Sequence, residues 1–580
     1  MKLRYGWGVV GGIVGLLVLC LLGRRLFVLQ AMSYEVLGCR ACVVPNVLAS
    51  DVPYWAVVVA LFVVSFGRRG WLWRGVWRGV ALLGVALYAA DMWVMSQFST
   101  RLMLADIRVY TADTAQALAL VLQWPLLHQL LVVGGLVLGA ALWWWPVSEP
   151  ISRRGIVLCG IALAGLGGGA WAYTPPGYVH EWALKNVVQA NWPTGLAAPY
   201  SHATQERLLA ERPPEQCWAG RDQRDHVVML VLESWSTYHS QAWLGVNDWT
   251  PRLDAWAAQG RQFETLYAGG FNTNEGLFSL LTGRDVVLPI LPAHQQGAFE
   301  GAWGIENSLP AQLGKQGYQT TFMTSGNLAY TRKGEWLSQL GFEALWGHDA
   351  PAFDGVERGH FGAVPDDVLY SSALAHITRL RQDHAASLTV IENVSSHHPY
   401  VHPYSGERSE EAVFRYMDKA AGEFIDQLAA SGFLEEGTLV VVSDHRAMTF
   451  VTAEEQARFG LGAVSRIPGF MLGRGVEPGK VTLPFHQADI MPTLLRQQGE
   501  RVCLHGPLRD GLDVAASEPR CMMHARGDQR DRVNVYCPEG KGTIKVMGDD
   551  SYFVNNEGLE SGRRQQLLDA LARQRLALEP

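Results

Sequence analysis

The stretch Val227–Glu233 reads Val-Val-Met-Leu-Val-Leu-Glu, a continuous apolar run that ends in a carboxylate. A second run, Leu439–Ser443, is followed directly by Asp444 and His445. Short runs of this kind are typical of strands that are buried on both faces, as in parallel sheets. In open α/β sheets, ligands bind at the edge where the strands end. We therefore expect Glu233, Asp444 and His445 to lie together at that edge.

Around these runs, strand patterns alternate with helical patterns, which predicts a mostly parallel sheet between helices. The expected order is a strand at 226–232, helices at 251–259, 274–282 and 308–316, a strand at 319–324, a helix at 367–381, a strand at 387–391, a helix at 410–430, a strand at 438–443 and a helix at 487–497. A small hairpin at 542–554 and a helix at 561–576 are expected to follow.

The first 175 residues differ from the rest by their long apolar runs. Runs at about 7–23, 52–67, 79–98, 125–145 and 155–173 approach the roughly 17–25 residues that a membrane span needs. Basic residues cluster in alternate connections, which the positive-inside rule assigns to the cytoplasm, so an odd number of spans exports the remainder. The sequence predicts a membrane domain of about five helices at 1–175, a polar, helix-poor linker at 176–225 and an exported α/β domain at 226–580.

The net charge and the cysteine content indicate which partners and which cellular compartment to expect. The net charge is −7 over 580 residues, with no basic stripe, so nucleic acid is not expected as a partner. An even number of cysteines falls in the exported part, where an oxidising environment favours one or two disulfides. These cysteines are Cys217, Cys503, Cys521 and Cys537, and their spacing leaves the pairing open.

Thr273 stands directly before the helical pattern at 274–282. A threonine hydroxyl needs a base or a cation to become a nucleophile. One divalent ion on Glu233, Asp444 and His445 would contact the Thr273 oxygen and lower its pKa, while the helix start would favour a phosphate. Three protein ligands and one reactive oxygen suit Zn²⁺, and the oxygen-rich set also suits Mn²⁺, both in preference to Mg²⁺. The alternative is that Thr273 is only a helix N-cap.

Several motifs now become recognisable together. The segment from Thr273 to Gly283 resembles the sulfatase signature C/S-x-P-S-R-x-x-L-L-T-G, with Thr273 in the nucleophile position. Ser443–His445 resembles the sulfatase metal motif, and Asp489–Leu495 resembles the D-I-x-P-T-L-L helix of the alkaline phosphatase superfamily. With Leu232–Ser234 and Ser396–Tyr400, they are similar to the lipoteichoic acid synthase and periplasmic glucan phosphoglycerol transferase branch. The resemblance covers most of residues 50–580, and that branch also begins with several membrane spans.

The resemblance implies a sulfatase/alkaline phosphatase-like domain in which one metal is held by Glu233, Thr273, Asp444 and His445. It also implies that His397, the first histidine of an H-x-P-[FY] motif, contacts the substrate phosphate or the leaving group. Independently, His397 follows a predicted strand and is expected at the same edge of the sheet.

Two further substrate-binding candidates follow from the same comparison of motifs. Arg332 or Lys333 resembles the substrate-binding arginine region of the branch, although the spacing is shorter than in lipoteichoic acid synthases. A solvated charge pair is the alternative. His486 stands just before the helix that begins near Asp489 and is expected to reach the site.

Sulfatases oxidise a cysteine or serine to formylglycine, which a threonine cannot become, so sulfate ester hydrolysis is disfavoured. The resemblance instead implies that Thr273 attacks a phosphodiester and that an acceptor hydroxyl resolves the phosphothreonine. The expected donor is phosphatidylglycerol at the outer face of a bacterial inner membrane. The expected acceptor is an envelope glycan or a polyglycerol-phosphate polymer. Phosphoethanolamine transfer from phosphatidylethanolamine and a catalytically silent lipid sensor remain as alternatives.

Overall fold

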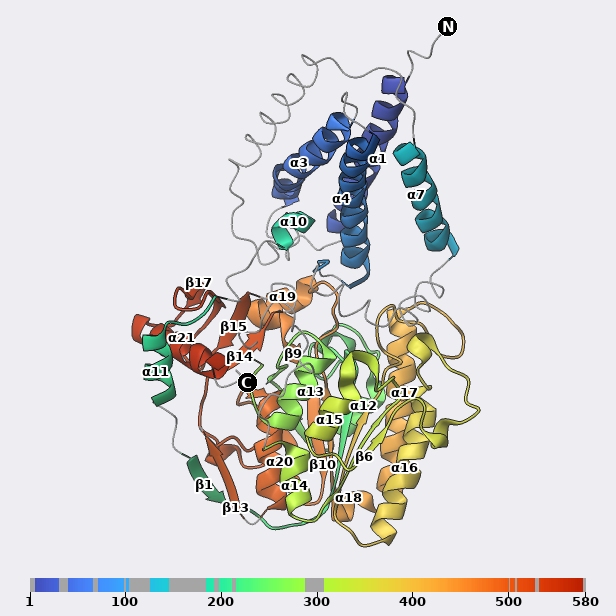
Figure 1. Ribbon diagram of the computed structural model, residues 1–580. Coiled ribbons are helices and arrows are strands. Elements are labelled where there is room, and N and C mark those ends of the chain that lie inside the picture. The colour runs from blue at the N-terminus through green and yellow to red at the C-terminus, as the bar shows by residue number, and fades with distance from the viewer. Residues whose placement is uncertain are drawn as a thin grey trace. The chain divides into compact units, whose positions relative to one another are not determined.

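The computed structural model of the chain describes residues 6–30, 40–65, 71–98, 101–103, 126–144, 184–191, 198–210, 215–286, 307–499, 501–505, 508–526 and 531–576. Its contacts divide the chain into two compact units (Figure 1). The first is Met1–Pro193 with Phe450–Ala453, and the second is Thr194–Thr449 with Glu454–Pro580.

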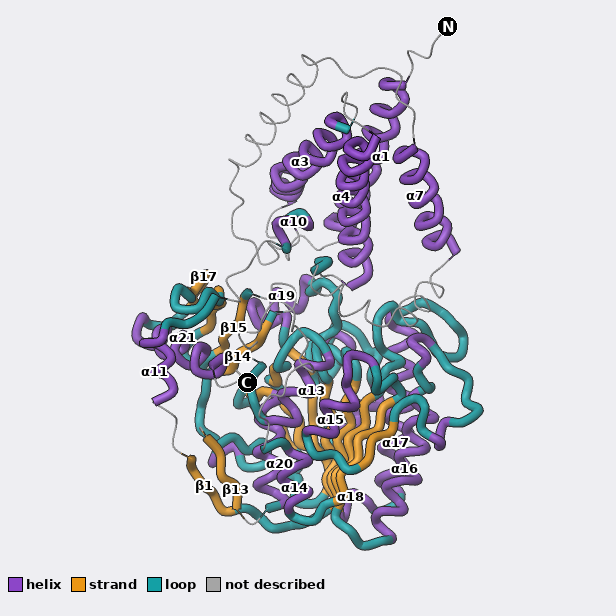
Figure 2. Tube along the Cα trace, viewed as in Figure 1, coloured by secondary structure: helices purple, strands orange, loops and turns teal. Residues whose placement is uncertain are grey.

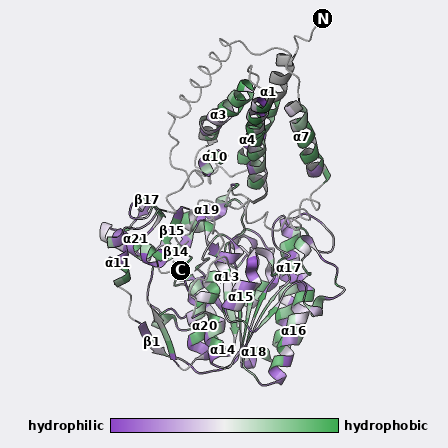
Figure 3. Cartoon of the chain, in the orientation of Figure 1, coloured by the Kyte–Doolittle hydropathy of each residue, from purple (hydrophilic) through white to green (hydrophobic). Residues whose placement is uncertain are grey.

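Long apolar helices make up the first unit. They are α1 (Gly6–Gln30), α3 (Arg40–Val64), α4 (Trp71–Phe98) and α7 (Leu126–Trp144), with a short α10 (Val187–Ala190) after them. Within the described residues, Val43–Val64 and Leu72–Ser96 are long and apolar enough to cross a membrane, and α7 contributes a shorter apolar stretch. Figure 3 shows α4 and α7 as largely hydrophobic. The span expected at 155–173 lies outside the described residues, so the five-span topology stays a prediction.

Buried ion pairs join the helices of this unit. Arg25 of α1 donates to Asp51 of α3 at 2.7 Å, and the Tyr88 hydroxyl of α4 donates to the same carboxylate at 2.6 Å. Near the end of α4, Arg101 donates to Asp91 through its Nε at 3.0 Å. Charged groups in apolar surroundings are costly unless they are paired, and these acidic groups are all paired with arginine.

The second unit is built on a mixed sheet of eight strands among the described residues, in the order β11-β3-β10-β8-β2-β7-β5-β6. The strands are β2 (His226–Leu232), β3 (Arg261–Phe263), β5 (Gln319–Thr324), β6 (Ala344–Trp346), β7 (Ser387–Glu392), β8 (Gly437–Ser443), β10 (Gly469–Gly473) and β11 (Gly479–Val481). The neighbours β8, β2, β7, β5 and β6 are parallel, as expected. Only β10 runs antiparallel to its neighbours, because the chain re-enters the sheet at the edge where β8 ends.

Helices cover both faces of the sheet, as the sequence predicted (Figure 2). They are α12 (Pro251–Ala257), α13 (Thr273–Thr282), α14 (Leu309–Lys315), α15 (Lys333–Gln339), α16 (Asp366–Gln382), α17 (Glu410–Ala430), α18 (Phe433–Glu436) and α20 (Ile490–Gln498). Successive side chains of a strand point to opposite faces. Met229 of β2 therefore packs in one core with Leu280 of α13, whereas Leu230 packs in the other with Met417 of α17.

Small sheets complete the second unit. A three-stranded sheet contains β12 (Phe485–His486), β4 (Leu266–Tyr267) and β9 (Arg466–Ile467). An antiparallel sheet contains β14 (Met522–Ala525), β15 (Arg532–Tyr536), β16 (Lys541–Lys545) and β17 (Tyr552–Glu557), and α21 (Ser561–Leu576) packs on it. The expected hairpin at 542–554 corresponds to β16 and β17, and the expected terminal helix is confirmed.

Part of the segment expected to be a linker is ordered in the second unit. The helix α11 (His202–Ala210) packs on α21 through Leu208 and Leu576. The strand β1 (Glu215–Ala219) pairs with β13 (Arg501–His505). The polar sequence at 176–225 concealed both elements, because α11 buries little beyond Leu208 and β1 is mostly exposed.

Two disulfides link the four cysteines of this unit, within the range that the sequence predicted. Cys217 of β1 is bonded to Cys503 of β13, 286 residues apart in sequence. Cys521 is bonded to Cys537, beside the paired strands β14 and β15. The structure therefore supplies the pairing that the spacing left open.

Serine at both Cys217 and Cys503 is expected to destabilise the second unit by about 2–4 kcal/mol, because the long loop in the unfolded chain is no longer closed. The measurement is the denaturant dependence of proteolysis of the full-length protein. Cys20→Ser is the matched control, because Cys20 is a free thiol on α1. Equal midpoints for the double variant and the control would contradict this role of the disulfide.

Candidate active site

Glu233, Asp444 and His445 form a buried cluster at the carboxyl edge of the sheet. Glu233 follows β2, and Asp444 and His445 follow β8, whose Ser443 lies opposite Leu232 in the parallel register. One potential ligand atom from each of the three lies within 4.8 Å of the others. Their exposed fractions are 2%, 0% and 0%. The in-register ends of two neighbouring strands thus bring these side chains together, as the sequence predicted.

Backbone donors fix one oxygen of Asp444 and leave the other facing the cluster. Asp444 Oδ1 accepts from the backbone N–H groups of Ser234 at 2.8 Å and His445 at 2.7 Å. Asp444 Oδ2 is buried and accepts no hydrogen bond from the described residues. It lies 3.2 Å from His445 Nε2. A buried oxygen of this kind suits a cation, because burying a carboxylate without a partner is costly.

The His445 ring also presents a ligand atom to the cluster. Its Nδ1 lies 2.8 Å from the carbonyl oxygen of Arg446, so the neutral ring donates there and turns the Nε2 lone pair towards Asp444 and Glu233. Burial opposes a charge on His445, but the carboxylates of Asp444 and Glu233 outweigh it and raise its pKa to about 9. A bound cation would replace that proton.

The two carboxyl groups have opposite pKa shifts. Burial opposes ionisation of Glu233, but the charges of His397 and His445 outweigh it and lower its pKa. Burial, and then the charge of Glu233, hold the pKa of Asp444 well above its ordinary value. A bound divalent cation would neutralise both carboxylates at once.

Thr273 is the first residue of α13 and reaches the cluster with its hydroxyl. Its Oγ1 donates to Glu233 Oε2 at 3.1 Å and lies 3.5 Å from His445 Nε2. Asn272, not Thr273, is the N-cap, and its side chain accepts from the N–H of Glu275. The interpretation of Thr273 as only a helix cap is therefore wrong.

The distances from His445 Nε2 to the other three groups match the spacing of ligands around one tetrahedral ion. Ligand atoms about 2.0–2.1 Å from a tetrahedral ion lie about 3.3 Å from one another. The separations from His445 Nε2 to Asp444 Oδ2, Glu233 Oε1 and Thr273 Oγ1 are 3.2, 3.5 and 3.5 Å. Two carboxylates, one imidazole and one hydroxyl suit Zn²⁺ or Mn²⁺.

His397 lies on the loop that follows β7. Its backbone N–H donates to the carbonyl of Val394 at 2.9 Å, and its Nδ1 lies 2.5 Å from the carbonyl oxygen of His398. After burial, His397 has the largest influence on the pKa of Glu233. The preceding residue, Ser396, donates through its Oγ to the Glu233 carbonyl at 2.8 Å, so the loop that carries His397 lies against the residue that ends β2.

Asn393 ties this loop to Glu233 and was not singled out from the sequence. Its Oδ1 accepts from the Glu233 N–H at 2.8 Å, and its Nδ2 donates to Ser396 Oγ at 3.1 Å and to Asp366 Oδ2 at 2.8 Å. Ser396 Oγ in turn donates to the Glu233 carbonyl at 2.8 Å. The sequence does carry a signal for Asn393, because it is a polar residue directly after a buried strand, as Glu233 and Asp444 are.

Lys333, rather than Arg332, reaches the carboxyl edge of the sheet. Lys333 bonds to both carboxylate oxygens of Glu392, a buried residue at the end of β7. The Arg332 side chain is 60% exposed and pairs with Glu335 of α15. The structure thus agrees with the solvated charge pair for Arg332 and does not bring this residue to the cluster.

His486 lies in a separate buried network. Its Nδ1 is 3.3 Å from Asp285 Oδ1, and Asp285 in turn pairs with Arg520. The N–H of Ala488 donates to the same ring nitrogen at 3.1 Å. Burial lowers the pKa of His486, so the ring is neutral. None of these contacts joins His486 to Glu233, Asp444 or His445, so substrate binding by His486 stays a prediction.

Glu233→Gln and His445→Gln each remove a charged or coordinating group from the cluster. The affinity of the full-length protein for Zn²⁺ or Mn²⁺ is expected to fall by more than the roughly 10- to 100-fold typical of changes around a metal site. Equilibrium dialysis with metal analysis measures it. Glu410→Gln is the control, because Glu410 is a partly buried carboxylate that bonds to His239 outside the cluster. Unchanged affinity in the cluster variants would exclude a metal centre here.

Asn393→Ala is expected to weaken metal binding about 10- to 100-fold, because the backbone of Glu233 loses its anchor. The same dialysis measures the effect, with the melting temperature as a check on folding. Asn327→Ala is the control, since the Asn327 side chain caps an exposed turn through the N–H of Ala329. A loss of stability without a loss of metal affinity would contradict the positioning role.

A family model described as Sulfatase matches residues 225–499. Lipoteichoic acid synthase 1 of Bacillus subtilis is 22% identical over 214 residues, which cover 33% of this chain and 33% of the relative. Phosphoglycerol transferase I of Xanthomonas euvesicatoria pv. vesicatoria is 27% identical over 151 residues, which cover 23% of this chain and 21% of the relative. The matched part thus spans a third or less of each relative's length.

A solved structure supports the fold independently. It is a protein in the alkaline phosphatase superfamily from Vibrio parahaemolyticus, with 19% sequence identity and a TM-score of 0.53, and the match covers 66% of this chain and 96% of that chain. The residues that the family model matches include Glu233, Asp444 and His445. Residues 225–499 of this chain therefore form a sulfatase-family domain with homologues among lipoteichoic acid synthases and phosphoglycerol transferases.

Proposed function

We propose that this protein transfers a phosphoglycerol head group from phosphatidylglycerol to an envelope glycan or a polyglycerol-phosphate polymer, through a phosphothreonine at Thr273. The observation that carries the proposal is the Thr273 hydroxyl, which lies 3.1 Å from Glu233 Oε2 and 3.5 Å from His445 Nε2. The names of the relatives support the phosphoglycerol head group.

In the first half of the reaction, the Thr273 oxygen attacks phosphorus and the bond from phosphorus to the diacylglycerol oxygen breaks. Glu233 Oε2, which accepts the Thr273 hydrogen bond, is placed to take the hydroxyl proton. Glu233, Asp444, His445 and the Thr273 oxygen would hold a Zn²⁺ or Mn²⁺, which would supply positive charge to lower the pKa of this hydroxyl and to neutralise the phosphate. His397 donates a proton to the departing diacylglycerol oxygen.

In the second half, an acceptor hydroxyl attacks the phosphothreonine and the Thr273 oxygen leaves. His397 now accepts the proton of the attacking hydroxyl, and Glu233 returns a proton to Thr273, which restores the enzyme. Attacking and leaving oxygens lie roughly in line across phosphorus. Diacylglycerol therefore leaves from the side opposite Thr273, and the acceptor hydroxyl later attacks from that same side. The cycle is ping-pong because the first product leaves before the acceptor reacts.

A lipid donor requires access to a membrane. Support comes from the apolar helices Val43–Val64 and Leu72–Ser96, which are long enough to cross one. The disulfides Cys217–Cys503 and Cys521–Cys537 support an oxidising compartment for the sulfatase-family domain. We therefore propose a multi-pass protein of the bacterial inner membrane, with about five spans and its catalytic domain in the periplasm.

Incubating the metal-loaded full-length protein with phosphatidylglycerol vesicles is expected to add a glycerophosphoryl group to Thr273, detected by peptide mass spectrometry. Thr273→Ala is expected to abolish the adduct and to lower transfer by at least about 10³-fold, as for other removed nucleophiles. Thr282→Ala is the control, because Thr282 lies in the same helix and its hydroxyl donates to the Phe278 carbonyl.

Phosphatidylethanolamine vesicles are tested in parallel. An ethanolamine phosphate adduct in place of the glycerophosphoryl adduct would replace the donor but keep the nucleophile. A folded, metal-loaded protein that forms no adduct with either lipid would sink the proposal and favour a non-catalytic role.

A further inference from the structure

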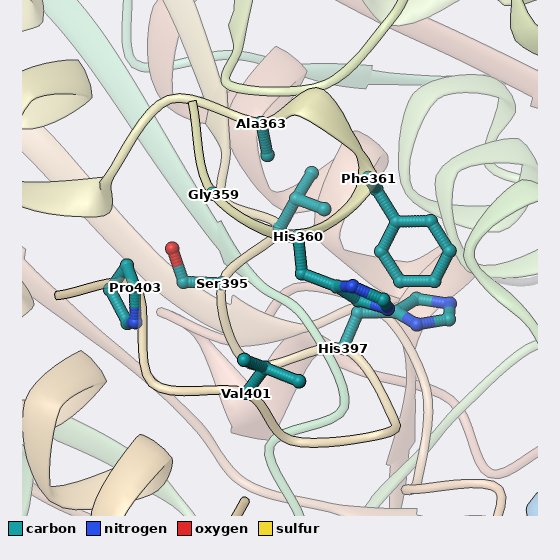
Figure 4. Close-up of a pocket in the computed structure, with 9 residues that line it drawn as sticks. Gly359, His360, Phe361, Ala363, Ser395, His397, Val401 and Pro403 are labelled. Carbon is teal, nitrogen blue, oxygen red and sulfur yellow. The ribbon is translucent and has the colours of Figure 1, made fainter. Parts of the chain in front are cut away.

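A small pocket opens beside His397 (Figure 4). The cavity is small, about 10 Å³, which is room for one group the size of a water molecule or a hydroxyl, and two histidines, His360 and His397, line it. Phe361, Val401 and Pro403 contribute apolar surface. Among the described residues that line the pocket, none is Lys, Arg, Asp or Glu. A pocket without a formal cation is poorly suited to a phosphate but well suited to an uncharged polar group.

A tight turn holds His360 in the pocket wall. The turn is a 3₁₀ segment, His360–Gly362, in which Phe361 has the left-handed φ of 59°. The Gly359 N–H donates to the Ala363 carbonyl at 2.8 Å and closes the turn. A bulky residue with positive φ is uncommon, and such backbone tends to occur where function requires it. Here it sets the Phe361 ring edge-on to His397, with the centroids 4.8 Å apart.

His360 is a neutral hydrogen-bonding group at physiological pH. Burial, and then the nearby charge of His397, lower the pKa of His360 to about 4. A neutral imidazole offers one donor and one acceptor. A hydroxyl group also both donates and accepts, so it matches this ring better than a phosphate oxygen, which only accepts. The apolar surface beside the ring suits the carbon skeleton of an alcohol.

His397 connects the pocket to the proposed reaction. It forms part of the pocket wall, and its ring lies beside the ring of His360 (Figure 4). In the proposed second half-reaction, His397 accepts the proton of the attacking hydroxyl. The acceptor must therefore lie against His397, and the rest of the acceptor molecule then extends into adjoining space.

We propose that the pocket formed by the His360 turn and His397 binds the acceptor, and that it selects a polyol with neighbouring hydroxyls, such as a glycerol or sugar unit. This inference rests on the proposed function. One hydroxyl attacks phosphorus at His397, and a neighbouring hydroxyl bonds to His360. Diacylglycerol, the first leaving group, has no free hydroxyl beside its reacting oxygen, so His360 serves the second half-reaction only.

The test separates the two half-reactions in the metal-loaded full-length enzyme with phosphatidylglycerol vesicles. One readout is the rate of the Thr273 adduct, and the other is its partition between transfer to added glycerol and hydrolysis by water. His360→Ala is expected to raise the KM for glycerol about 5- to 10-fold, the value of one hydrogen bond, with adduct formation and hydrolysis unchanged. His360→Gln, which keeps a donor and an acceptor, is expected to restore most of the transfer.

His402→Ala is the control, because His402 lies in the loop of His397, does not line the pocket and caps an exposed turn through the N–H of Tyr404. Unchanged transfer in His360→Ala overturns the acceptor pocket. An equal fall of adduct formation and transfer in His360→Ala and His360→Gln also overturns it, because it reveals a structural role. Failure of the wild-type enzyme to form the adduct overturns the proposed function itself, and the acceptor pocket with it.

Discussion

The in-register parallel pairing of β2 with β8 is the constraint on which the site depends. It ends both strands at the same level, with Leu232 opposite Ser443, so the next residues of each strand meet at one edge. A shift of one residue would turn each side chain to the opposite face of the sheet. The alternating residues of β2, packed into two separate cores, prevent that shift. The burial that stabilises the sheet thereby also sets the position of Glu233 relative to Asp444.

The fold was largely predictable because its central strands are apolar runs. The strands at 226–232 and 319–324 have the expected bounds, whereas β3, β6, β10 and β11 were missed because they are only three to five residues long. The cluster was predictable from residues at strand ends. Asn393 was not, since its role depends on the contact with the Glu233 backbone. Neither was the choice between Arg332 and Lys333, which neighbour each other but point to different partners, Glu335 and Glu392.

Buried charge is treated differently in the two units. In the apolar helices, Arg25 balances Asp51 and Arg101 balances Asp91. At the edge of the sheet, Glu233 and Asp444 both lie close to one imidazole, that of His445. In the first arrangement each buried carboxylate has its own arginine, so neither carboxylate remains unpaired. In the second, burial raises the pKa of Asp444 and the carboxylates raise the pKa of His445, so protons offset the charge of Glu233 until a cation displaces them.

The helix α11 and the strand β1 belong to the second unit although they precede its large sheet. A soluble fragment that starts at the first strand of the large sheet, residue 226, would contain every residue of the cluster. It would nevertheless leave Cys503 without Cys217 and expose Leu576 of α21, which α11 covers through Leu208. A free thiol and a bare apolar helix face both promote association between molecules. Part of the segment that the sequence predicted to be a linker therefore covers the surface of the second unit.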